Sequence, residues 1–133
     1  MQFVTATAFS WGNRRFVVFP EPYLLWEGLL HTWNKYAPSC YTFEKQGVRA
    51  TLQSAVTVTR CCLHTHTLHY PDYTQKGFVG VCSYWIRASS DITAFLTTLA
   101  AFAFYSGVGY KTTMGMGQVR VTFTNQQKGV VLP

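Results

Sequence analysis

The amino-acid sequence predicts an α+β fold of the ferredoxin-like or RRM-like type, a four-stranded antiparallel sheet with two helices on one face and an inserted β-hairpin. Two stretches carry apolar residues at helical spacing, residues 23–37 and 92–106. Around them lie stretches rich in Val, Thr and aromatic residues that alternate as strands do. The resulting order, strand, helix, strand, strand, helix, strand, is that of the split β-α-β fold. A length of 133 residues suffices for one such domain with its own core.

The first strand is expected from Gln2 to Phe9, a segment rich in Thr, Val and Phe. A turn that contains Gly12 and Asn13 follows at once, and Phe16–Phe19 is again apolar. These features predict a hairpin with two arginines, Arg14 and Arg15, at or just beyond its turn. The basic turn is a candidate for binding a phosphate backbone, and ordinary solvated loop charges are the alternative.

The first helix is expected from Tyr23, after two prolines that stop extended pairing, and it ends at Pro38. Its apolar stripe consists of Trp26, Leu29, Leu30, Trp33 and Ala37. The spacing of these residues matches one face of a helix. The sequence therefore predicts that this helix packs on the sheet through its tryptophans and leucines.

The middle of the chain predicts two long strands. Residues from Gly47 to His69 alternate, with Val56, Val58, Arg60, Cys62, His64, His66 and Leu68 nominally on one face. Pro71, Asp72 and Gly77 mark a turn into a second strand over Phe78–Arg87. Both strands are rich in β-branched and aromatic residues, which favour a pleated sheet.

The second helix is expected to open at Ser89, Ser90 or Asp91, all good N-cap types, and to end at Gly107. Ile92–Tyr110 carries no charge, but its threonines and its one-sided apolar stripe predict a buried helix rather than a membrane span. A last strand is expected over Gln118–Phe123. Residues 1–124 thus form the predicted domain, and 125–133 form a tail with no assigned structure.

The composition points to a covered surface and an anionic partner. Only 12% of residues are charged, against about 25% in an average soluble chain. Hydrophobic residues make up 48% and aromatic residues 17% of the chain. With 11 Lys and Arg against 5 Asp and Glu, the net charge is +6, and nucleic acid is the commonest large anion.

Neither a secreted disulfide scaffold nor a signal peptide is indicated. The four cysteines, Cys40, Cys61, Cys62 and Cys82, have no CxxC spacing. The amino terminus lacks a basic stretch followed by an apolar run. A cytoplasmic protein without a membrane partner is therefore expected.

A glycine-rich loop between the second helix and the last strand is the sharpest local feature. Gly107-Val108-Gly109 and Gly115-Met116-Gly117 enclose five residues that include Lys111, Thr112 and Thr113. Glycines leave backbone amides open to an anion, and the lysine and hydroxyls add further donors. A P-loop and a dinucleotide fingerprint are excluded, because both run from a strand into a helix. The alternative is a tight helix-to-strand connection packed against the sheet.

This loop resembles the signature of the CRISPR precursor-RNA processing endoribonucleases of the RAMP superfamily, in which two G-hydrophobic-G units flank five residues near the carboxyl end. Leu99–Gly107 is similar to the helix that leads into that loop, and Gly77–Gly80 to the start of the preceding strand. Pro22–Asn34 resembles the first helix of the family. Phe3–Phe9 is similar to the F-x-T-P-T-x-F opening of its carboxyl-terminal domain, with Ala6 in place of the usual proline.

The resemblance implies a role in RNA binding and a chain that corresponds to the carboxyl-terminal half of the family alone. An amino-terminal domain of comparable size is then absent. In the family, cleavage needs no metal or other cofactor: the ribose 2′-hydroxyl attacks the adjacent phosphate, and a general base, often a histidine of the amino-terminal domain, removes its proton. No residue here matches that base, so no catalytic residue is assigned. The expected RNA-binding residues are Gly107, Gly109, Lys111, Thr112, Thr113, Gly115, Gly117, Arg120, Arg14 and Arg15.

The remaining polar and aromatic candidates have several readings. Cys62, His64 and His66 would be spaced about 7 Å apart on a flat strand, too far for one zinc ion without a bulge. Contact with RNA on an exposed sheet face and plain solvated polarity are the alternatives. Four aromatic residues could stack on bases or simply pack in the fold: Tyr84, Trp85, Tyr105 and Tyr110.

Three functions follow for the chain. The first is the RNA-binding domain of a CRISPR endoribonuclease, with repeat RNA and the missing amino-terminal domain as partners. The second is a non-catalytic RAMP subunit that docks proteins of a crRNA-guided complex. The third is a small nuclease that uses His64, His66 or His69. A half-protein that has lost its partner should expose apolar surface, so self-association, as in a homodimer, is also expected.

Overall fold

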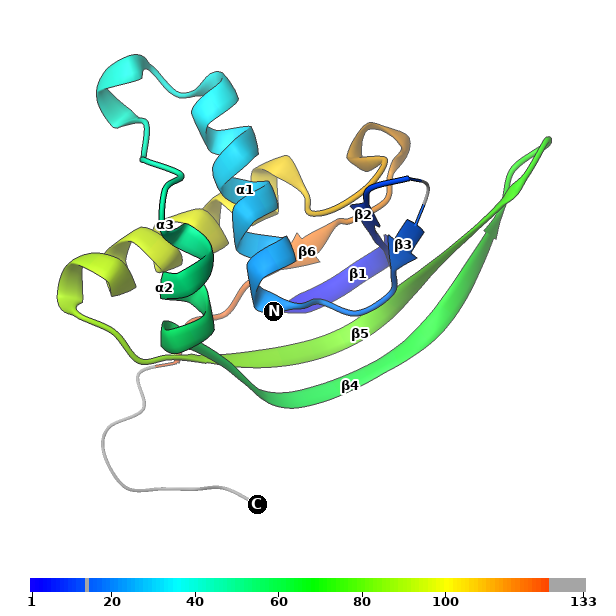
Figure 1. Ribbon diagram of the computed structural model, residues 1–133. Helices are drawn as coiled ribbons and strands as arrows, with labels where there is room; N and C mark the ends of the chain where they lie inside the picture. Colours follow the sequence, from blue (N-terminus) through cyan, green and yellow to red (C-terminus); the bar gives the residue numbers. More distant parts are fainter. Residues whose placement is uncertain (14, 125–133) are drawn as a thin grey trace.

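The computed structural model describes residues 1–13 and 15–124, and it confirms the predicted α+β class. Four antiparallel strands form a sheet in the order β4-β5-β1-β6, and the helices lie together on one face of it (Figure 1). The elements are β1 (Gln2–Thr7), β2 (Phe9–Trp11), β3 (Arg15–Val17), α1 (Pro22–Tyr36), η1 (Ser39–Tyr41), α2 (Val48–Ala55), β4 (Val56–His69), β5 (Thr74–Ile86), α3 (Ser90–Ser106), η2 (Thr112–Met114) and β6 (Val119–Arg120). The first and third strands of the main sheet, β1 and β5, occupy its centre.

The core lies between the sheet and the helices α1 and α3. Phe3 of β1 and Phe78 of β5 are buried, with ring centroids 4.9 Å apart. From α1, Trp26 is buried and donates its indole N–H to the carbonyl of Leu96 in α3, at 3.0 Å. Because this hydrogen bond joins the two helices inside the core, it fixes their packing as well as satisfying a buried donor. Prolines and glycines bound both helices as predicted, with Pro22 in the first turn of α1 and Gly107 at the end of α3.

The predicted continuous strand from Gly47 to His69 is wrong in its first part. Val48–Ala55 forms the helix α2 in place of the predicted strand, so that three α-helices rather than two cover the described part of the sheet. Gly47 starts this helix in the left-handed region, at a φ of 77°. The apolar residues Val48, Leu52 and Ala55 recur at helical spacing, and the last two are buried. That spacing was the available signal, masked by the alternation that follows it.

A bulge in β4 changes which face of the strand each residue occupies. Val58 pairs with Tyr84 and Arg60 with Ser83, so Thr59 is an extra residue on the β4 side. The expected single face from Val56 to Leu68 is therefore broken. Val56 and Val58 face the helices, whereas Arg60 and the alternate residues after it lie on the opposite face.

Several strand ends differ from prediction. β5 begins at Thr74 rather than Phe78, and the turn before it is Tyr70–Tyr73. The predicted last strand pairs over Val119–Arg120 alone. The inserted hairpin is present as β2 and β3, which form a separate two-stranded sheet. The predicted tail, 125–133, lies outside the described residues.

The face of the sheet opposite the helices is called here the uncovered face. It carries three exposed apolar side chains, Val4, Val81 and Trp85. Arg120 lies on it too. The neighbouring pair Phe3–Val119 is buried beneath the helices, and side chains alternate along a strand, so the side chains of the Gln2–Arg120 pair point to the opposite face. In the described residues no helix is long and apolar enough to cross a membrane.

Candidate RNA-binding site

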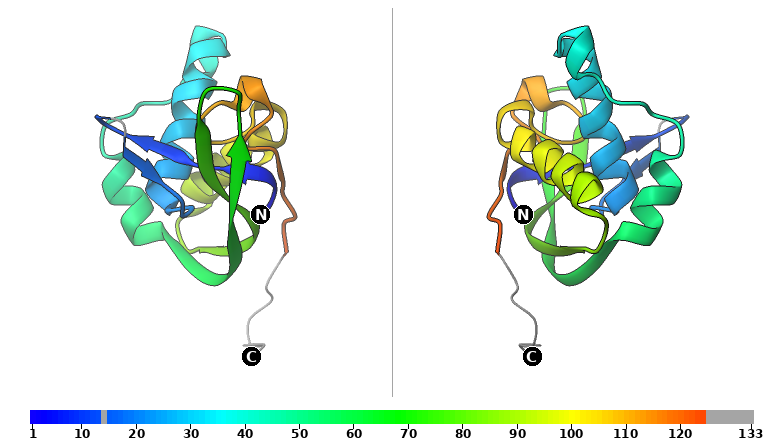
Figure 2. Two further views of the ribbon diagram at one scale, coloured as in Figure 1. Left: turned by 90° about the vertical axis from the view of Figure 1, so that its right-hand side faces the viewer. Right: turned by 90° about the vertical axis from the view of Figure 1, so that its left-hand side faces the viewer.

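Three segments far apart in the sequence lie toward one end of the molecule, and together they are called here the loop end. They are the glycine loop Gly107–Gly117, the β2–β3 hairpin, and the tip of the β4–β5 hairpin at residues 70–73, which projects beyond the other two (Figures 1 and 2). The ring of Phe16 in β3 lies 4.9 Å from that of Tyr110 in the loop. Lys111 of the loop contacts the Tyr73 hydroxyl at the hairpin tip. The fold thus joins the loop that the sequence singled out to two hairpins.

The glycine loop packs tightly on the backbone of β1 and of itself. A Cβ atom at Gly117 would lie 1.9 Å from the carbonyl oxygen of Val108, and one at Gly109 would lie 2.3 Å from that of Ala8. Both glycines also have positive φ, 72° and 79°. These two positions therefore admit glycine alone, for space as well as for backbone conformation.

Many of the loop amides donate to protein acceptors. The amide of Val108 donates to Gly117, Tyr110 to Ala8 and Gly117 to Ala6, each at a distance of 2.7–3.0 Å. Met114 and Met116 both donate to the carbonyl of Lys111. The expected open row of amides facing an anion is therefore wrong at these positions, and the alternative of a tight connection packed against the sheet describes them. Side chains of the loop remain as candidate RNA contacts.

Among these side chains, that of Lys111 has three tyrosine rings around its ammonium. Its ammonium lies 3.8 Å from the ring centroid of Tyr73, 5.0 Å from that of Tyr70 and 5.3 Å from that of Tyr110. The distances to Tyr70 and Tyr110 fall within the range of cation–π attraction, whereas the ammonium meets Tyr73 at its hydroxyl. The two hairpin tyrosines were not predicted as site residues. The sequence signal was their position on either side of Pro71-Asp72, at the tip of a long hairpin.

The other predicted residues are distributed as follows. Thr113 and Gly115 are exposed in the loop, and Thr112 is half-buried beside Gly107. Arg15 opens β3, is exposed and pairs with Trp11 across the hairpin, whereas Arg14 lies outside the described residues. Arg120 lies on the uncovered face of the sheet rather than in the loop.

Of the four aromatic candidates, Tyr84 and Tyr110 pack against other elements. Tyr84 lies 5.1 Å from Trp26 and donates its hydroxyl to the Pro20 carbonyl, and burial raises the pKa of its phenol. Tyr110 packs on Phe16. Trp85 and Tyr105 are exposed, at 54% and 81%, but on different surfaces, the uncovered face and α3.

Cys62, His64 and His66 follow the β4 bulge and are exposed on the same side of the strand. Within residues 1–13 and 15–124, no group of three or more His, Cys, Asp or Glu side chains is placed to hold a metal ion. These side chains lie along the β4–β5 hairpin that leads to the loop end.

Charge is distributed unevenly over the described residues. Lys111, Arg15 and Lys76 lie in the glycine loop and the two hairpins, where Asp72 is the acidic residue. The remaining acidic residues are Glu21, Glu27, Glu44 and Asp91, which lie in or beside the helices. The electrostatic potential is therefore more favourable for a polyanion at the loop end than beside the helices.

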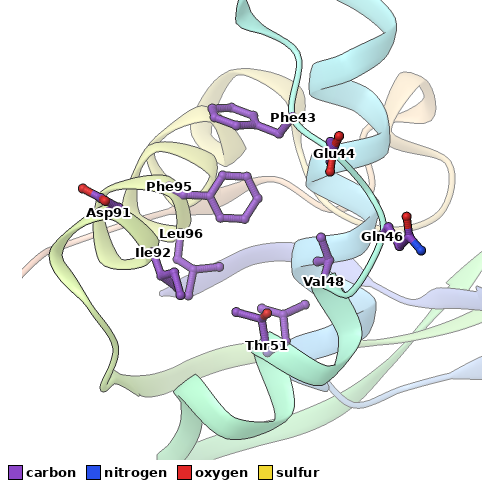
Figure 3. A pocket seen from close by; sticks show the side chains of 10 residues that line it. Phe43, Glu44, Gln46, Val48, Thr51, Asp91, Ile92, Phe95 and Leu96 are labelled. Carbon is purple, nitrogen blue, oxygen red and sulfur yellow. The ribbon is translucent and has the colours of Figure 1, made fainter.

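A cavity of about 350 Å³ lies elsewhere, between α2, α3 and the segment before α2. Phe95 and Ile92 face Val48 and Thr51 across it, and Glu44 and Asp91 are its acidic residues (Figure 3). An apolar lining with two carboxylates disfavours a phosphate backbone. This cavity is therefore no candidate for RNA.

The fold and the loop define a class of protein: a ferredoxin-like domain with the glycine-rich loop of the RAMP type. Residues 1–119 match the family model "CRISPR-associated endoribonuclease Cas6", and the chain belongs to that family. Among curated relatives, the Cas6 endoribonuclease of Streptococcus thermophilus is 24% identical over 119 residues, and that of Mycobacterium tuberculosis is 27% identical over 127. The match covers 90% and 91% of this chain, but 48% and 38% of those proteins.

Solved Cas6 structures share the fold. The Cas6 of Thermus thermophilus superposes with a TM-score of 0.76 at 28% identity, over 87% of this chain and 49% of that one. A second Cas6, solved as a product complex and as a substrate mimic complex, gives 0.71 at 34% identity over 88% of this chain. The chain thus spans about half the length of the relatives it matches.

Proposed function

We propose that residues 1–124 are the carboxyl-terminal RRM-like domain of an endoribonuclease that processes precursor CRISPR RNA, and that the loop end binds the repeat RNA. The observation that supports this proposal is that the family's glycine loop contacts both hairpins, through Tyr110 on Phe16 and Lys111 on Tyr73, at the end of the molecule where Arg15 and Lys76 are exposed. Basic and aromatic side chains in one place are what single-stranded or hairpin RNA requires. The proposed setting is the cytoplasm of a prokaryote.

The proposed reaction is metal-independent attack of a ribose 2′-hydroxyl on the neighbouring phosphate. The O–P bond to the 5′ oxygen of the next nucleotide breaks, which leaves a 2′,3′-cyclic phosphate and a 5′-hydroxyl. A general base is needed for the 2′-hydroxyl proton, and we place it outside this domain, in an amino-terminal domain of comparable size. The role of the loop end is to bind and orient the RNA, which contributes to rate by fixing the reacting atoms in line.

A titration of the chain with CRISPR repeat RNA, followed by gel shift, tests the binding. Arg15→Gln should weaken binding by about tenfold, since hydrogen bonds to charged groups contribute about 1.5 kcal/mol. Arg87→Gln is the matched control, because Arg87 is an exposed arginine that follows β5 beside α2. Wild-type affinity should also fall steeply as salt rises, because phosphate contacts release counterions.

Absence of any shift with repeat RNA at low salt would contradict the RNA-binding function. Cleavage is tested separately by incubating the chain with repeat RNA in EDTA and analysing the product ends. We expect no product from this chain alone. A cyclic-phosphate product would show instead that the chain carries its own base, as the reading with His64, His66 or His69 requires.

The second candidate function is a non-catalytic RAMP subunit that docks protein partners of a crRNA-guided complex. The observation that favours it is the set of exposed apolar residues Val4, Val81 and Trp85 on the uncovered face. In a pull-down, retention of protein partners after ribonuclease treatment, together with failure to bind RNA, would favour this function over the first.

A further inference from the structure

We propose that Lys111 is a positioning residue whose ammonium holds the tip of the β4–β5 hairpin on the glycine loop, so that its charge acts on tyrosine rings rather than on an RNA phosphate. The RNA-dependent part of this inference rests on the proposed function; the contact itself does not. It replaces the expectation that the loop lysine binds phosphate directly.

The backbone of Lys111 is held in place before its side chain makes any contact. Its φ and ψ are 54° and 41°, in the left-handed region. Its carbonyl accepts the amides of both Met114 and Met116, and Met116 is fully buried. The loop thus fixes the direction in which the lysine side chain leaves it, a condition for a contact that positions a second element.

At the other end, the ammonium meets a preformed aromatic pair. The rings of Tyr70 and Tyr73 stack with centroids 4.8 Å apart and planes inclined by 20°, and the Tyr70 amide donates to the Tyr73 carbonyl at 2.9 Å. The Lys111 ammonium contacts the Tyr73 hydroxyl, at the edge of that ring. Tyr110, next to Lys111, supplies a third ring from the loop itself. A cation among three rings loses less free energy on leaving water than a cation without such partners.

The tip of the hairpin, residues 71–74, is exposed, whereas Gln75 and Gly77 below it are buried. β1 pairs with β5 only as far as Phe78, so residues 74–77 are paired within the sheet with β4 alone. A two-stranded ribbon is marginally stable without further packing. By holding the tip, Lys111 sets the direction of the ribbon and of the side chains it carries, among them His64, His66 and Lys76.

The contact is tested first without RNA, by the rate of chymotrypsin cleavage after Tyr73 under native conditions. Lys111→Met keeps the aliphatic stem and removes the charge, and we expect cleavage at least about fivefold faster, because a weakly held ribbon opens more often. Tyr73 itself must stay intact in this assay. Lys76→Met is the matched control: it removes an equal charge from the same ribbon, and Lys76 has no cation–π contact among the described residues. Equal cleavage rates for wild type and Lys111→Met would overturn the proposal.

The second test measures the salt dependence of repeat-RNA affinity. A lysine that neutralises a phosphate contributes about 0.7 to 0.9 to the slope of log K against log salt. We expect Lys111→Met to weaken binding while the slope stays unchanged. Tyr73→Leu should have the same effect without altering any charge. Lys111→Arg should keep wild-type binding, since a guanidinium also binds ring faces. A slope reduced by about one phosphate in Lys111→Met would overturn the positioning role. If the wild type binds no RNA, the proposed function fails, and the cleavage assay still decides on the contact.

Discussion

Different physical constraints require glycine at different positions of the glycine loop. Gly109 and Gly117 touch backbone oxygens of other segments, so that any side chain there would push apart the loop and its neighbours. Gly115, with a φ of 86°, has no atom within 4 Å of the place where a Cβ would be. In the repeated motif, close packing therefore requires glycine at positions 109 and 117, whereas only the backbone conformation favours it at position 115.

Gly117→Ala should lower the free energy of unfolding by about 3 kcal/mol. This is the sum of the cost of holding an alanine in the left-handed region and the cost of the shift that its Cβ forces on the neighbouring backbone. Gly115→Ala should cost only about 1 kcal/mol, for the backbone conformation. Urea unfolding of the two variants measures both values. Equal losses would show that the contact of Gly117 with Val108 relaxes without cost.

At the level of elements, the β4 bulge determines how two adjacent cysteines differ. Cys61 pairs across the sheet with Cys82, and their sulfur atoms lie 2.6 Å apart. Cys62 pairs with Val81, on the uncovered face. Cys61 is exposed and Cys82 is buried, and burial raises the pKa of the Cys82 thiol to about 12.

We expect oxidised glutathione to join Cys61 and Cys82 in a disulfide. The exposed Cys61 sulfur first forms a mixed disulfide and releases one glutathione; the Cys82 thiolate then displaces the second, so that two protein thiols are oxidised and one glutathione disulfide is reduced. Because Cys82 is protonated at neutral pH, this second step should accelerate as pH rises. Intact mass and thiol alkylation followed by peptide mapping measure the product.

The matched control is Cys62→Ser, which should leave this disulfide unchanged, whereas Cys61→Ser and Cys82→Ser should abolish it. A disulfide that contains Cys62, or persistence of the mixed disulfide at alkaline pH, would contradict the assignment.

For the whole molecule, the feature that stands out is a sheet with one face covered by helices and the other exposing Val4, Val81 and Trp85. The relatives that this chain matches are about twice its length. An apolar face without a partner favours association between copies.

Sedimentation velocity of the chain should therefore show concentration-dependent self-association, and Trp85→Lys should weaken it by about tenfold or more, because a buried aromatic ring contributes well over 1 kcal/mol. Phe104→Lys is the control, since Phe104 is equally exposed at 54% but lies on α3. A strictly monomeric chain, or equal effects of the two substitutions, would contradict this role of the uncovered face.

How much could be predicted from the sequence depends on whether the signal was local. The helices α1 and α3, the hairpin near Arg15 and the ends at Pro22 and Gly107 were predicted correctly, because apolar spacing, proline and glycine act within a few residues. The glycine motif also pointed to the family before any tertiary information. The sequence by itself thus determined the class of fold, the family and the loop at the centre of the candidate site.

Tertiary structure decided what the sequence left open. The helix α2, the bulge at Thr59 and the short β6 depend on which residues meet across the sheet, and local alternation does not report that. Likewise, Lys111 is separated by 38 positions from Tyr73, the ring its ammonium approaches most closely. Its surroundings arise only when the hairpin folds back beside the loop. A side chain's neighbours, and hence the target of its charge, follow from the packing of distant segments, which no local pattern encodes.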